Sequence, residues 1–514
     1  MKMIRVQKLM AVALACGLTL TSTNLFAQSP DFVPVGPPVS VGPQQYSLPY
    51  AAVPLVSPQG PKNGGVQLGQ SYDGIDFLGS NCFCLPPDTS SAVGNNFVVE
   101  TVNVQIRIFD KTSGAQLLNE PLSTFFGAPS RGDPYVVYDD NADRWYVSAF
   151  DSTVSGLVLA VSSDGNPLLG FRTYHLTNVG GFADYQKSGF NKDAIFISYN
   201  DFGLGGGAAA TIVAIDKAAA LSGTLNYFVS RPKFQFRAMP PAQMHDDEQG
   251  GVEWFVSTDG TDAGGSTIRV TKMTNYLSNT PQFTYTSLPV TQYKYAHRAD
   301  QPGGTVTTFP NTTTTQVQYH KGHLVTAMAS STASDGFVYP KGLYYQIHVN
   351  RKGVSEPRLM KEGVIDPGPG VAVQMPSVDE DQQGNLGLTW MESSSTEYLS
   401  MWVGINKGGE KEEEEEGEEK RDGNLSAQPA APGLGFFFVS FRIGDYSTIM
   451  LDPSDGKTFW AANEYIGSDG ATDIWRTHIT SFAARCAEID EEERPQSFED
   501  KKCSEDRGPN TGPI

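Results

Sequence analysis

Basic residues are scarce in this chain of 514 residues. There are 37 Lys and Arg against 57 Asp and Glu, and the formal net charge is −20. Nucleic-acid binding depends on neutralising phosphates with Lys and Arg, and docking on an anionic membrane surface needs the same cations. The composition therefore argues against a nucleic-acid partner and against an anionic membrane as a docking surface.

Long apolar runs are also missing, because no stretch reaches the roughly 20 residues of a membrane span. The N-terminal apolar stretch, residues 9–20, is short and ends before Ala27. Three basic residues precede it: Lys2, Arg5 and Lys8. This order is typical of a secretory signal peptide over residues 1–27. A lipoprotein signal at Cys16 is the weaker alternative, so we expect a secreted or periplasmic protein without membrane insertion.

Cysteine is rare, with five residues in the whole chain. Four lie beyond the predicted signal: Cys82, Cys84, Cys486 and Cys503. An even number in an exported chain indicates disulfides, with three possible connectivities. A Cys82–Cys84 bridge would close a very tight ring, so we favour cross-links between the first and the last pair. Zinc is the weaker alternative, since one residue rather than two separates Cys82 from Cys84.

No long stretch has a helical period, whereas Gly and Pro are abundant, with 53 and 33 residues. Residues 28–80 are rich in both and predict an extended lead-in. Residues 407–432 contain a run of glutamates, whose self-repulsion predicts a disordered loop. We expect one all-β domain over residues 81–484, which includes this loop and lies between the lead-in and an acidic tail at 485–514.

A hairpin pattern recurs along this domain, clearest at residues 132–150, 183–200 and 444–463. Each copy has a short strand, a polar turn rich in Asp, Asn and Gly, and a second strand with aromatic or aliphatic residues. Seven equivalent positions recur at intervals of about 50 to 70 residues: Phe97, Trp145, Ile195, Trp254, Leu324, Leu388 and Trp460. This repeat predicts a seven-bladed β-propeller, with six or eight blades as alternatives.

The chain resembles a family of uncharacterised secreted bacterial proteins predicted to be β-propellers. The motifs that carry the resemblance are residues 86–89, 132–134 with 138–139 and 142–145, 183–185, 444–447, 452–453, 458–460, 463–465 and 475–477. The match covers residues 82–482 and departs from the family pattern at the acidic loop. The resemblance implies the fold and an exported location, and it implies no activity.

Four aspartates stand at the start of the first hairpin in different repeats: Asp88, Asp133, Asp184 and Asp445. Innermost propeller strands line a central channel, so these carboxylates should converge and need a cation, basic partners or raised pKa values. We expect a ligand site there, with Asp133, Asp184 and Asp445 as candidates for catalysis and for a divalent cation such as calcium. Alternatively, each carboxylate holds its own turn or the next strand, which a recurring motif favours.

Residues that break the repeat are stronger functional candidates. Gln243 and His245 occupy the fourth repeat near the position of the aspartates, and Gln374 precedes the sixth. We expect them to join the ligand site, with His245 as a catalytic candidate. Three arginines are expected to balance the carboxylates or to hold an anionic group of a ligand: Arg131, Arg298 and Arg442.

Two further pairs of side chains have the chemistry of functional residues. His320 and His323 should face each other across a two-residue turn, although two ligands do not make a metal site. Glu464 and Tyr465 have the chemistry of an acid/base pair, but we expect them at a sheet edge.

Three functions remain open. The first is binding of an extracellular glycan or peptide on the channel face. The second is a carbohydrate-active hydrolase or lyase that uses the channel carboxylates, and the third is an envelope scaffold. No Walker loop, dinucleotide-binding glycine run, His-Glu-x-x-His helix or nucleophile elbow is present.

Overall fold

The computed structural model describes fifteen segments of the chain. These are residues 65–81, 83–129, 132–151, 156–177, 179–203, 209–232, 239–246, 250–258, 264–308, 313–333, 336–349, 356–408, 425–436, 442–468 and 473–485. All of them belong to one compact unit, Pro54–Ile514, and the other unit, Met1–Val53, lies outside the described residues. The predicted signal peptide, Cys16, Cys82, Arg131, Cys486, Cys503 and the core of the acidic loop also lie outside them.

Four sheets contain four antiparallel strands each. The first has β2 (Ser90–Val93), β3 (Phe97–Val102), β4 (Gln105–Asp110) and β5 (Gln116–Pro121). The second has β6 (Tyr135–Asp139), β7 (Arg144–Asp151), β8 (Gly156–Ser162) and β9 (Phe171–Leu176). The third has β24 (Ala372–Glu380), β25 (Leu386–Ser394), β26 (Glu397–Asn406) and β27 (Leu425–Ala431). The fourth has β29 (Thr448–Leu451), β30 (Phe459–Ser468), β31 (Asp473–Ala484) and β1 (Val66–Asp76).

The remaining strands form one large and two small sheets. The large sheet runs β13 (Tyr227–Ser230), β12 (Ala209–Asp216), β11 (Ala194–Asp201), β10 (Ala183–Phe190), β14 (Ala242–Met244), β20 (Val317–His320), β21 (His323–Ser330), β22 (Lys341–His348) and β23 (Arg358–Ile365). The small sheets are β15 (Glu253–Thr258), β16 (Gly265–Thr274) and β17 (Gln282–Tyr293), and β18 (Arg298–Gln301), β19 (Gly304–Thr308) and β28 (Arg442–Ile443).

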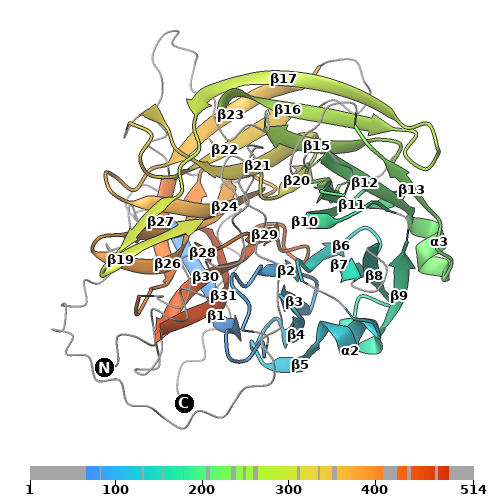
Figure 1. Ribbon diagram of the computed structural model, residues 1–514, viewed down its shortest axis with the longest axis horizontal. Coiled ribbons are helices and arrows are strands. Elements are labelled where there is room, and N and C mark those ends of the chain that lie inside the picture. Colours follow the sequence, from blue (N-terminus) through green and yellow to red (C-terminus); the bar gives the residue numbers. More distant parts are fainter. Residues whose placement is uncertain are drawn as a thin grey trace, which may run out of the picture. The chain divides into compact units, whose positions relative to one another are not determined.

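Helical structure in the described segments is confined to short pieces, α2 (Leu122–Phe126), α3 (Lys217–Ser222) and the 3₁₀ turn η1 (Pro167–Leu169). The sheets surround a common centre, with β2, β6, β10, β20, β24 and β29 nearest to it (Figure 1). This all-β propeller arrangement confirms the predicted fold class. No described helix is long and apolar enough to cross a membrane.

The number of sheets differs from the seven blades expected. Five sheets have four or more strands, because β14 pairs in parallel with both β10 and β20 and joins two antiparallel meanders into one sheet of nine. β14 is only three residues long, and Pro241 before it makes a single bridge to Phe255 of β15. A strand this short pairs more extensively with its inner neighbours than with the strands that follow it.

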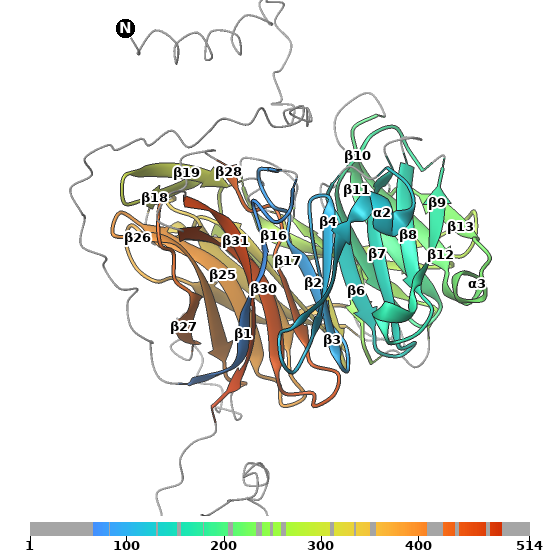
Figure 2. The same ribbon diagram turned by 90° about the horizontal axis from the view of Figure 1, so that it is seen from below.

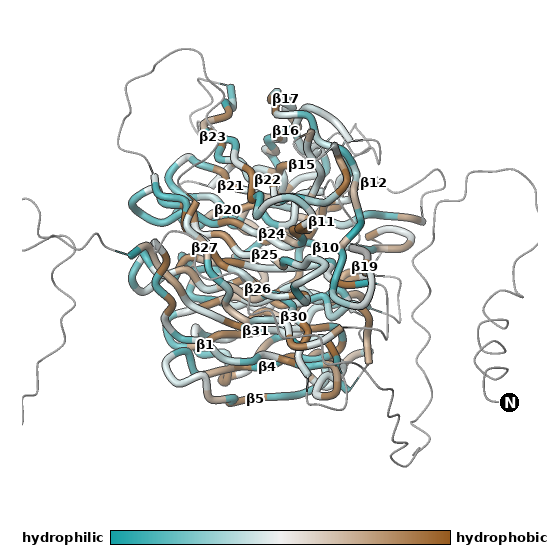
Figure 3. Tube along the Cα trace, turned by 90° about the vertical axis from the view of Figure 1, so that its left-hand side faces the viewer, coloured by the Kyte–Doolittle hydropathy of each residue, from teal (hydrophilic) through white to brown (hydrophobic). Residues whose placement is uncertain are grey.

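Local sequence explains the hairpins. In the β6–β7 hairpin, the Asp139 Oδ1 atom accepts a hydrogen bond from the Ala142 N–H (3.0 Å). Asp143 then adopts a positive φ of 53°, which Asp tolerates better than most residues. Trp145 follows and is fully buried against the apolar side chains between neighbouring sheets. Figure 3 shows hydropathy changing repeatedly along the strands, as expected for a core divided among sheet interfaces.

The predicted lead-in over residues 28–80 is wrong in its last part. Residues 66–76 form β1, which pairs antiparallel with the C-terminal strand β31, for example Val66 with Ala484. The predicted end of the lead-in was wrong because β1 is polar at most positions and exposed at many of them, so its sequence lacks the apolar pattern of a strand. Hydrogen bonds between the first and the last described strand therefore hold these two parts of the chain together. The predicted disulfide pairings lie mostly outside the described residues and stay a prediction.

Candidate functional site

The four predicted aspartates lie at or just before the starts of innermost strands. Asp88, Asp133 and Asp445 have positive φ values of 56°, 47° and 92°. In the repeat of Asp184, the following residue, Tyr185, has this conformation instead (56°). Asp and Asn tolerate the left-handed region because their short polar side chains bond locally. Backbone geometry therefore accounts for part of the repeating aspartate signal.

The structure brings these four carboxylates together as predicted, and it places two basic side chains among them. The charges of Asp88, Asp133, Asp184 and Asp445 all act on Lys187, and Arg442 acts on Asp88, Asp184 and Asp445. Arg442 also donates a hydrogen bond to Asp445 Oδ2. Asp88 and Asp445 are buried, whereas Asp133 and Asp184 are half-buried. We call these six residues the axial cluster.

Hydrogen bonds give the aspartates a structural role as well. Asp133 Oδ2 accepts from the Tyr185 N–H (2.8 Å) and from the Tyr446 hydroxyl (3.1 Å), so it links three innermost strands. Asp88 Oδ2 accepts from the Asn103 side-chain amide (2.5 Å). The other oxygens, Asp88 Oδ1 and Asp445 Oδ1, are buried and have no hydrogen-bond partner among the described residues. The cluster thus combines register-holding contacts with unsatisfied acceptors.

Burial dominates the electrostatics of the axial cluster. Burial and the charge of Asp133 raise the pKa of Asp184 to about 7. Burial raises the pKa of Asp445 to about 6 although Arg442 opposes the shift. The pKa of Asp88 is also raised by burial, while burial lowers the pKa of the Lys187 amine well below its ordinary value. The cluster therefore holds fewer charges near pH 7 than its residue types suggest.

The predicted calcium site gains no support from this geometry. Among the described residues, no group of three or more His, Cys, Asp or Glu side chains is arranged to hold a metal ion. The Arg442 guanidinium lies beside Asp88, Asp133 and Asp445 and balances part of their charge.

The other predicted ligand residues do not all join the cluster. Gln374 is fully buried, and neither end of its amide has a hydrogen-bond partner in the described part of the chain. Gln243 lies within β14 and accepts from the Gln318 amide (3.5 Å). Arg298 is 55% exposed and pairs with Asp300 on β18 (2.9 Å). Figure 2 shows β18 beside β19 and β28 at one end of the strands, and Arg298 lies on this small sheet with its side chain directed to Asp300.

Glu464 is not at a sheet edge as expected. It is 1% exposed, and its Oε2 atom accepts from the Gly444 N–H (2.9 Å), next to Asp445. Burial raises the pKa of Glu464 to about 8. Tyr465 donates its hydroxyl hydrogen to Asp73 of β1 (2.9 Å), so it ties the N-terminal strand to its sheet.

His245 lies at the opposite end of the innermost strands from the aspartates. Asp133 precedes β6 and Asp140 follows it, and the His245 Nδ1 atom is 2.9 Å from Asp140 Oδ1. The innermost strands β10, β14 and β20 run parallel, so residues after their ends share one mouth of the channel. The expectation that His245 joins the aspartates is therefore wrong. β14 spans only three residues, Ala242–Met244. His245 therefore lies beyond the end of this strand although it is close in sequence to the start of the strand.

A cavity of about 290 Å³ opens at this second mouth. Loops and strand ends from several sheets line it, with three histidines, Lys321 and several carboxylates. The carboxylate-bearing residues are Asp140, Asp246, Glu380, Asp381 and Asp452. We call this the histidine cavity.

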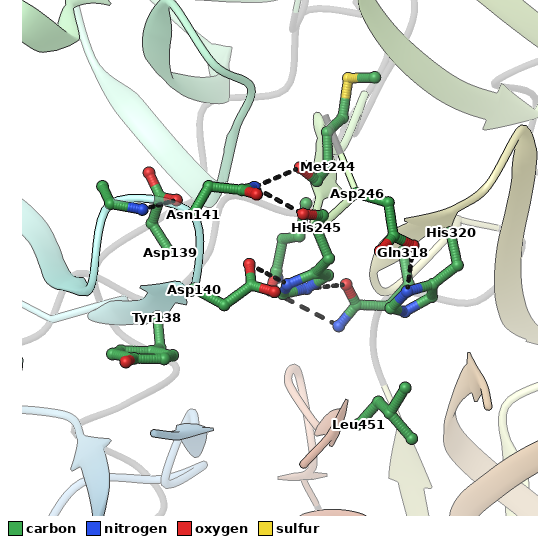
Figure 4. A network of polar contacts seen from close by, with 12 residues as sticks. Tyr138, Asp139, Asp140, Asn141, Met244, His245, Asp246, Gln318, His320 and Leu451 are labelled. Carbon is green, nitrogen blue, oxygen red and sulfur yellow. Dashed lines mark hydrogen bonds and ion pairs between the residues drawn. The ribbon is translucent and has the colours of Figure 1, made fainter. Parts of the chain in front are cut away.

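Each histidine of the cavity contacts a carboxylate, and Figure 4 shows His245 beside Asp140 and His320 beside Asp246. The His245 and His320 rings stack, with centroids 5.1 Å apart and planes 9° apart. His320 lies between Asp379 (2.9 Å) and Asp246 (3.4 Å). His320 and His323 are register partners across the two-residue turn, as predicted, and His323 contacts a different carboxylate, Glu380 (3.0 Å).

These pairs change the proton affinity of the histidines. Burial lowers the pKa of His320, but the charge of Asp379 and the hydrogen bonds to Asp246 and Asp379 outweigh it and raise the pKa to about 10. Burial and Asp140 act in the same opposed way on His245, and its pKa ends above 6.5. At neutral pH the His320 imidazole is therefore protonated and paired with two carboxylates, and the acidic partners raise the proton affinity of His245 as well.

Sequence reasoning missed Lys187 and the carboxylate partners of the histidines. Lys187 stands two residues after the positive-φ position, where other repeats have a smaller or aromatic residue: Ser90, Tyr135, Ser377 and Ser447. A lysine at a buried strand position was the signal that could have identified it. The partners Asp140, Asp246 and Asp379 come from three different repeats, and no spacing in the sequence relates them.

No family model matches the chain, and no curated protein matches it either. The propeller family resemblance therefore stays a prediction. Among solved structures, the chain is similar to a hydrazine synthase chain of Kuenenia stuttgartiensis (12% identity, 74% of this chain and 93% of that chain, TM-score 0.42). It is also similar to the WD40 domain of SCAP from fission yeast (9%, 76% and 82%, 0.33) and to a GH43 endo-arabinanase from Bacillus licheniformis (15%, 54% and 96%, 0.28). We draw no functional conclusion from similarities of this size.

Proposed function

We propose that this protein is an exported β-propeller that binds a small polar ligand, a glycan or a short peptide, in the histidine cavity. The observation that carries the proposal is the cavity itself, at the mouth where β6, β14, β20 and β24 end. Its volume of about 290 Å³ is near the lower end for small-molecule pockets. Export rests on the N-terminal pattern described above.

The lining suits a ligand with many hydroxyl or amide groups. Carboxylates of Asp140, Asp246 and Glu380 offer acceptors, whereas Lys321 and His323 offer donors. Leu451 and Pro453 supply limited apolar surface. A sugar ring presents both donors and acceptors around its edge, and so does a peptide backbone. A large apolar ligand would leave these charged groups without partners, which is costly.

The same proposal includes the number of repeats around the channel. The seven equivalent sequence positions fall in β3, β7, β11, β15, β21, β25 and β30, each the strand after an innermost strand. We infer seven radial units, with the nine-stranded sheet contributing two and β14 to β17 forming another. This grouping supports a channel whose mouth is lined by non-identical repeats, which allows an asymmetric ligand site.

A thermal-unfolding screen with neutral and acidic oligosaccharides, short peptides, calcium and a chelator tests the proposal. A ligand that binds only the folded state stabilises it by about 2.7 kcal/mol at a concentration 100 times Kd. We expect one glycan or peptide class to raise Tm, and His323→Gln with Lys321→Ala to abolish the rise. Lys192→Ala is the matched control, because Lys192 lines a different surface depression. A rise that survives the cavity variants would contradict the proposal.

A hydrolase is the second candidate, because the pKa values of two carboxyl groups that line the histidine cavity shift in opposite directions. The hydrogen bond from His320 lowers the pKa of Asp246, whereas burial raises the pKa of Asp381. Two carboxyl groups driven apart in this way are typical of an acid/base pair. Release of reducing ends from the stabilising glycan, lost in Asp246→Asn and in Asp381→Asn, would favour the enzyme. A rise in Tm without release of reducing ends favours a binding protein. A screen in which no compound raises Tm favours the scaffold.

A further inference from the structure

Acidic side chains outnumber basic ones in the lining of the histidine cavity. Five carboxylates line it, whereas its cationic groups are Lys321 and three imidazoles. The carboxylates are therefore in excess even when every imidazole is protonated. The charge of His320 is also shared with Asp379, which is fully buried and does not line the cavity. The lining consequently attracts a positively charged ligand and repels an anionic one.

Three of these carboxylates are already occupied by contacts within the protein. Asp452 forms an ion pair with Lys111 (2.8 Å). Both oxygens of Asp381 accept hydrogen bonds from main-chain and side-chain N–H groups of its own turn. The Glu380 carboxylate contacts His323 (3.0 Å), and its side chain is only 6% exposed. A ligand in the cavity therefore has to use the other two carboxylates.

Asp140 and Asp246 are these two carboxylates, and their side chains are 28% and 42% exposed. Each uses one oxygen for an imidazole of the stacked pair (Figure 4). Asp140 Oδ1 is 2.9 Å from His245 Nδ1, and Asp246 Oδ2 is 3.4 Å from His320 Nδ1. Within the described part of the chain, the second oxygen of each carboxylate has no hydrogen bond or ion pair to the protein. Because the two rings stack 5.1 Å apart, these two acceptors can serve one ligand.

We propose that the histidine cavity binds an amino sugar through its protonated amino group, with Asp140 and Asp246 as the acceptors. This inference rests on the proposed function, because it assigns a class of ligand to the same cavity. A primary ammonium group has three N–H donors, so it can satisfy both carboxylates and keep one donor for another acceptor of the lining. A hydroxyl group or an N-acetyl group has a single donor and balances no charge, so it leaves the acidic excess uncompensated.

The rest of the lining favours an amino sugar over a lysine side chain of a peptide. An amino sugar carries hydroxyl groups on the same ring as its amine, and Lys321, Gln382 and Gln383 offer donors and acceptors for them. A lysine side chain separates its ammonium group from the peptide backbone by four methylenes, which are best covered by apolar surface. The cavity supplies little of that surface, from Leu451 and Pro453. A compact ring with its charge and hydroxyl groups close together fits this lining better.

Calorimetric titration of the wild-type protein with glucosamine and with N-acetylglucosamine at pH 6.5 tests this inference. The two sugars differ only in the acetyl group, which removes the positive charge and all but one of the N–H donors. We expect glucosamine to bind at least about tenfold more tightly, because hydrogen bonds to charged groups are about twice as strong as neutral ones. Asp140→Asn and Asp246→Asn should each reduce this preference. Glu120→Gln removes one carboxylate from the outer strand β5 and should leave the preference unchanged.

The outcomes separate this inference from the proposed function. Equal or tighter binding of N-acetylglucosamine would overturn the inference, and the proposed function would stand if that binding is lost in His323→Gln with Lys321→Ala. Tighter binding of Nα-acetyl-lysine amide than of glucosamine would also overturn it, because the ligand would then be a peptide. A glucosamine preference that is unchanged in both Asp140→Asn and Asp246→Asn would place the sugar elsewhere and overturn it as well. If neither these compounds nor any member of the thermal-unfolding screen binds the cavity, both proposals fail.

Discussion

Asp133 shows how one residue serves both conformation and packing. Its positive φ fits the turn before β6, and its carboxylate accepts hydrogen bonds from the Tyr185 N–H and the Tyr446 hydroxyl. Asp133→Ala removes the acceptor and leaves both donors unsatisfied. We therefore expect the free energy of unfolding to fall by about 1–3 kcal/mol, measured by urea denaturation with an unchanged m value.

Arg298→Ala is the matched control for this substitution. Arg298 is mostly exposed, and its ion pair with Asp300 lies on the outer sheet β18–β19–β28. Exposed pairs contribute about 0–1 kcal/mol, so this variant should unfold close to the wild type. Equal stability of Asp133→Ala and wild type would show that the aspartate is not needed for the fold and would strengthen a role in ligand binding.

His320 makes stability depend on pH in a defined direction. Its folded pKa of about 10 exceeds its ordinary value of 6.5, so the folded protein binds the proton more tightly than the unfolded chain. The resulting stabilisation is fully present below pH 6.5 and is lost as pH rises towards 10. We expect the wild-type Tm to fall over this range and the curve of His320→Gln to be flatter.

His348→Gln serves as the comparison, because burial lowers the pKa of His348 instead of raising it. This variant should keep the alkaline decline of the wild type. If His320→Gln and wild type lose Tm in parallel between pH 6.5 and 10, the protonated state of His320 is not what stabilises the cavity.

At the scale of elements, hairpins were predictable and the relations between them were not. Turn residues and alternating apolar positions act over a few residues, so the sequence pattern located the second strand of every repeat. The four aspartates could be grouped because each repeat has a positive-φ residue at this point, which is the aspartate itself in three repeats and the residue after Asp184 in the fourth. His245 was misplaced because β14 is so short, and β1 was missed because an edge strand needs little apolar character. The Lys187 environment depends on four repeats at once.

The pairing of β1 with β31 predicts that the N-terminal strand is essential for the fold. Ile75 donates its N–H to Glu100 Oε2 (2.9 Å), and a Cβ at Gly74 would meet that carboxylate at 2.4 Å. A chain that begins after Asp76 would expose the edge of β31 and leave Glu100 buried without this donor. We expect it to aggregate or to unfold without cooperativity, as measured by size-exclusion chromatography and calorimetry.

A chain that begins at Gly65 is the control for that truncation. It retains all of β1, so it should remain monodisperse and melt with the same Tm as the full-length protein. Cooperative unfolding of the shorter chain at the wild-type temperature would show that β31 is stable as an edge strand.

At the scale of the whole molecule, net charge opposes the compact state. The formal charge of −20 causes self-repulsion, which salt screens over about 10 Å at 0.1 M. Residues 409–424 contain nine acidic and three basic residues, so replacing them with a short turn takes the charge to −14. The replacement is compatible with the fold because Asn406 and Leu425 are register partners on β26 and β27.

We expect added sodium chloride to raise the Tm of the wild type at pH 7 and to raise the Tm of the shortened variant less. Differential scanning calorimetry at 0.05 and 0.5 M salt measures both. A variant of the same length with the glutamates replaced by glutamine separates charge from loop length. Equal salt responses in all three proteins would mean that this segment does not contribute to the repulsion.

The pairing of β1 with β31 also determines when during synthesis the ring can close. β1 is the first described strand and β31 the last, so their ladder cannot form until every strand between them has been synthesised. Until then, the growing chain carries an unpaired strand at one end and incomplete sheets at the other. Closure of the ring by this ladder therefore follows the synthesis of all the other described strands.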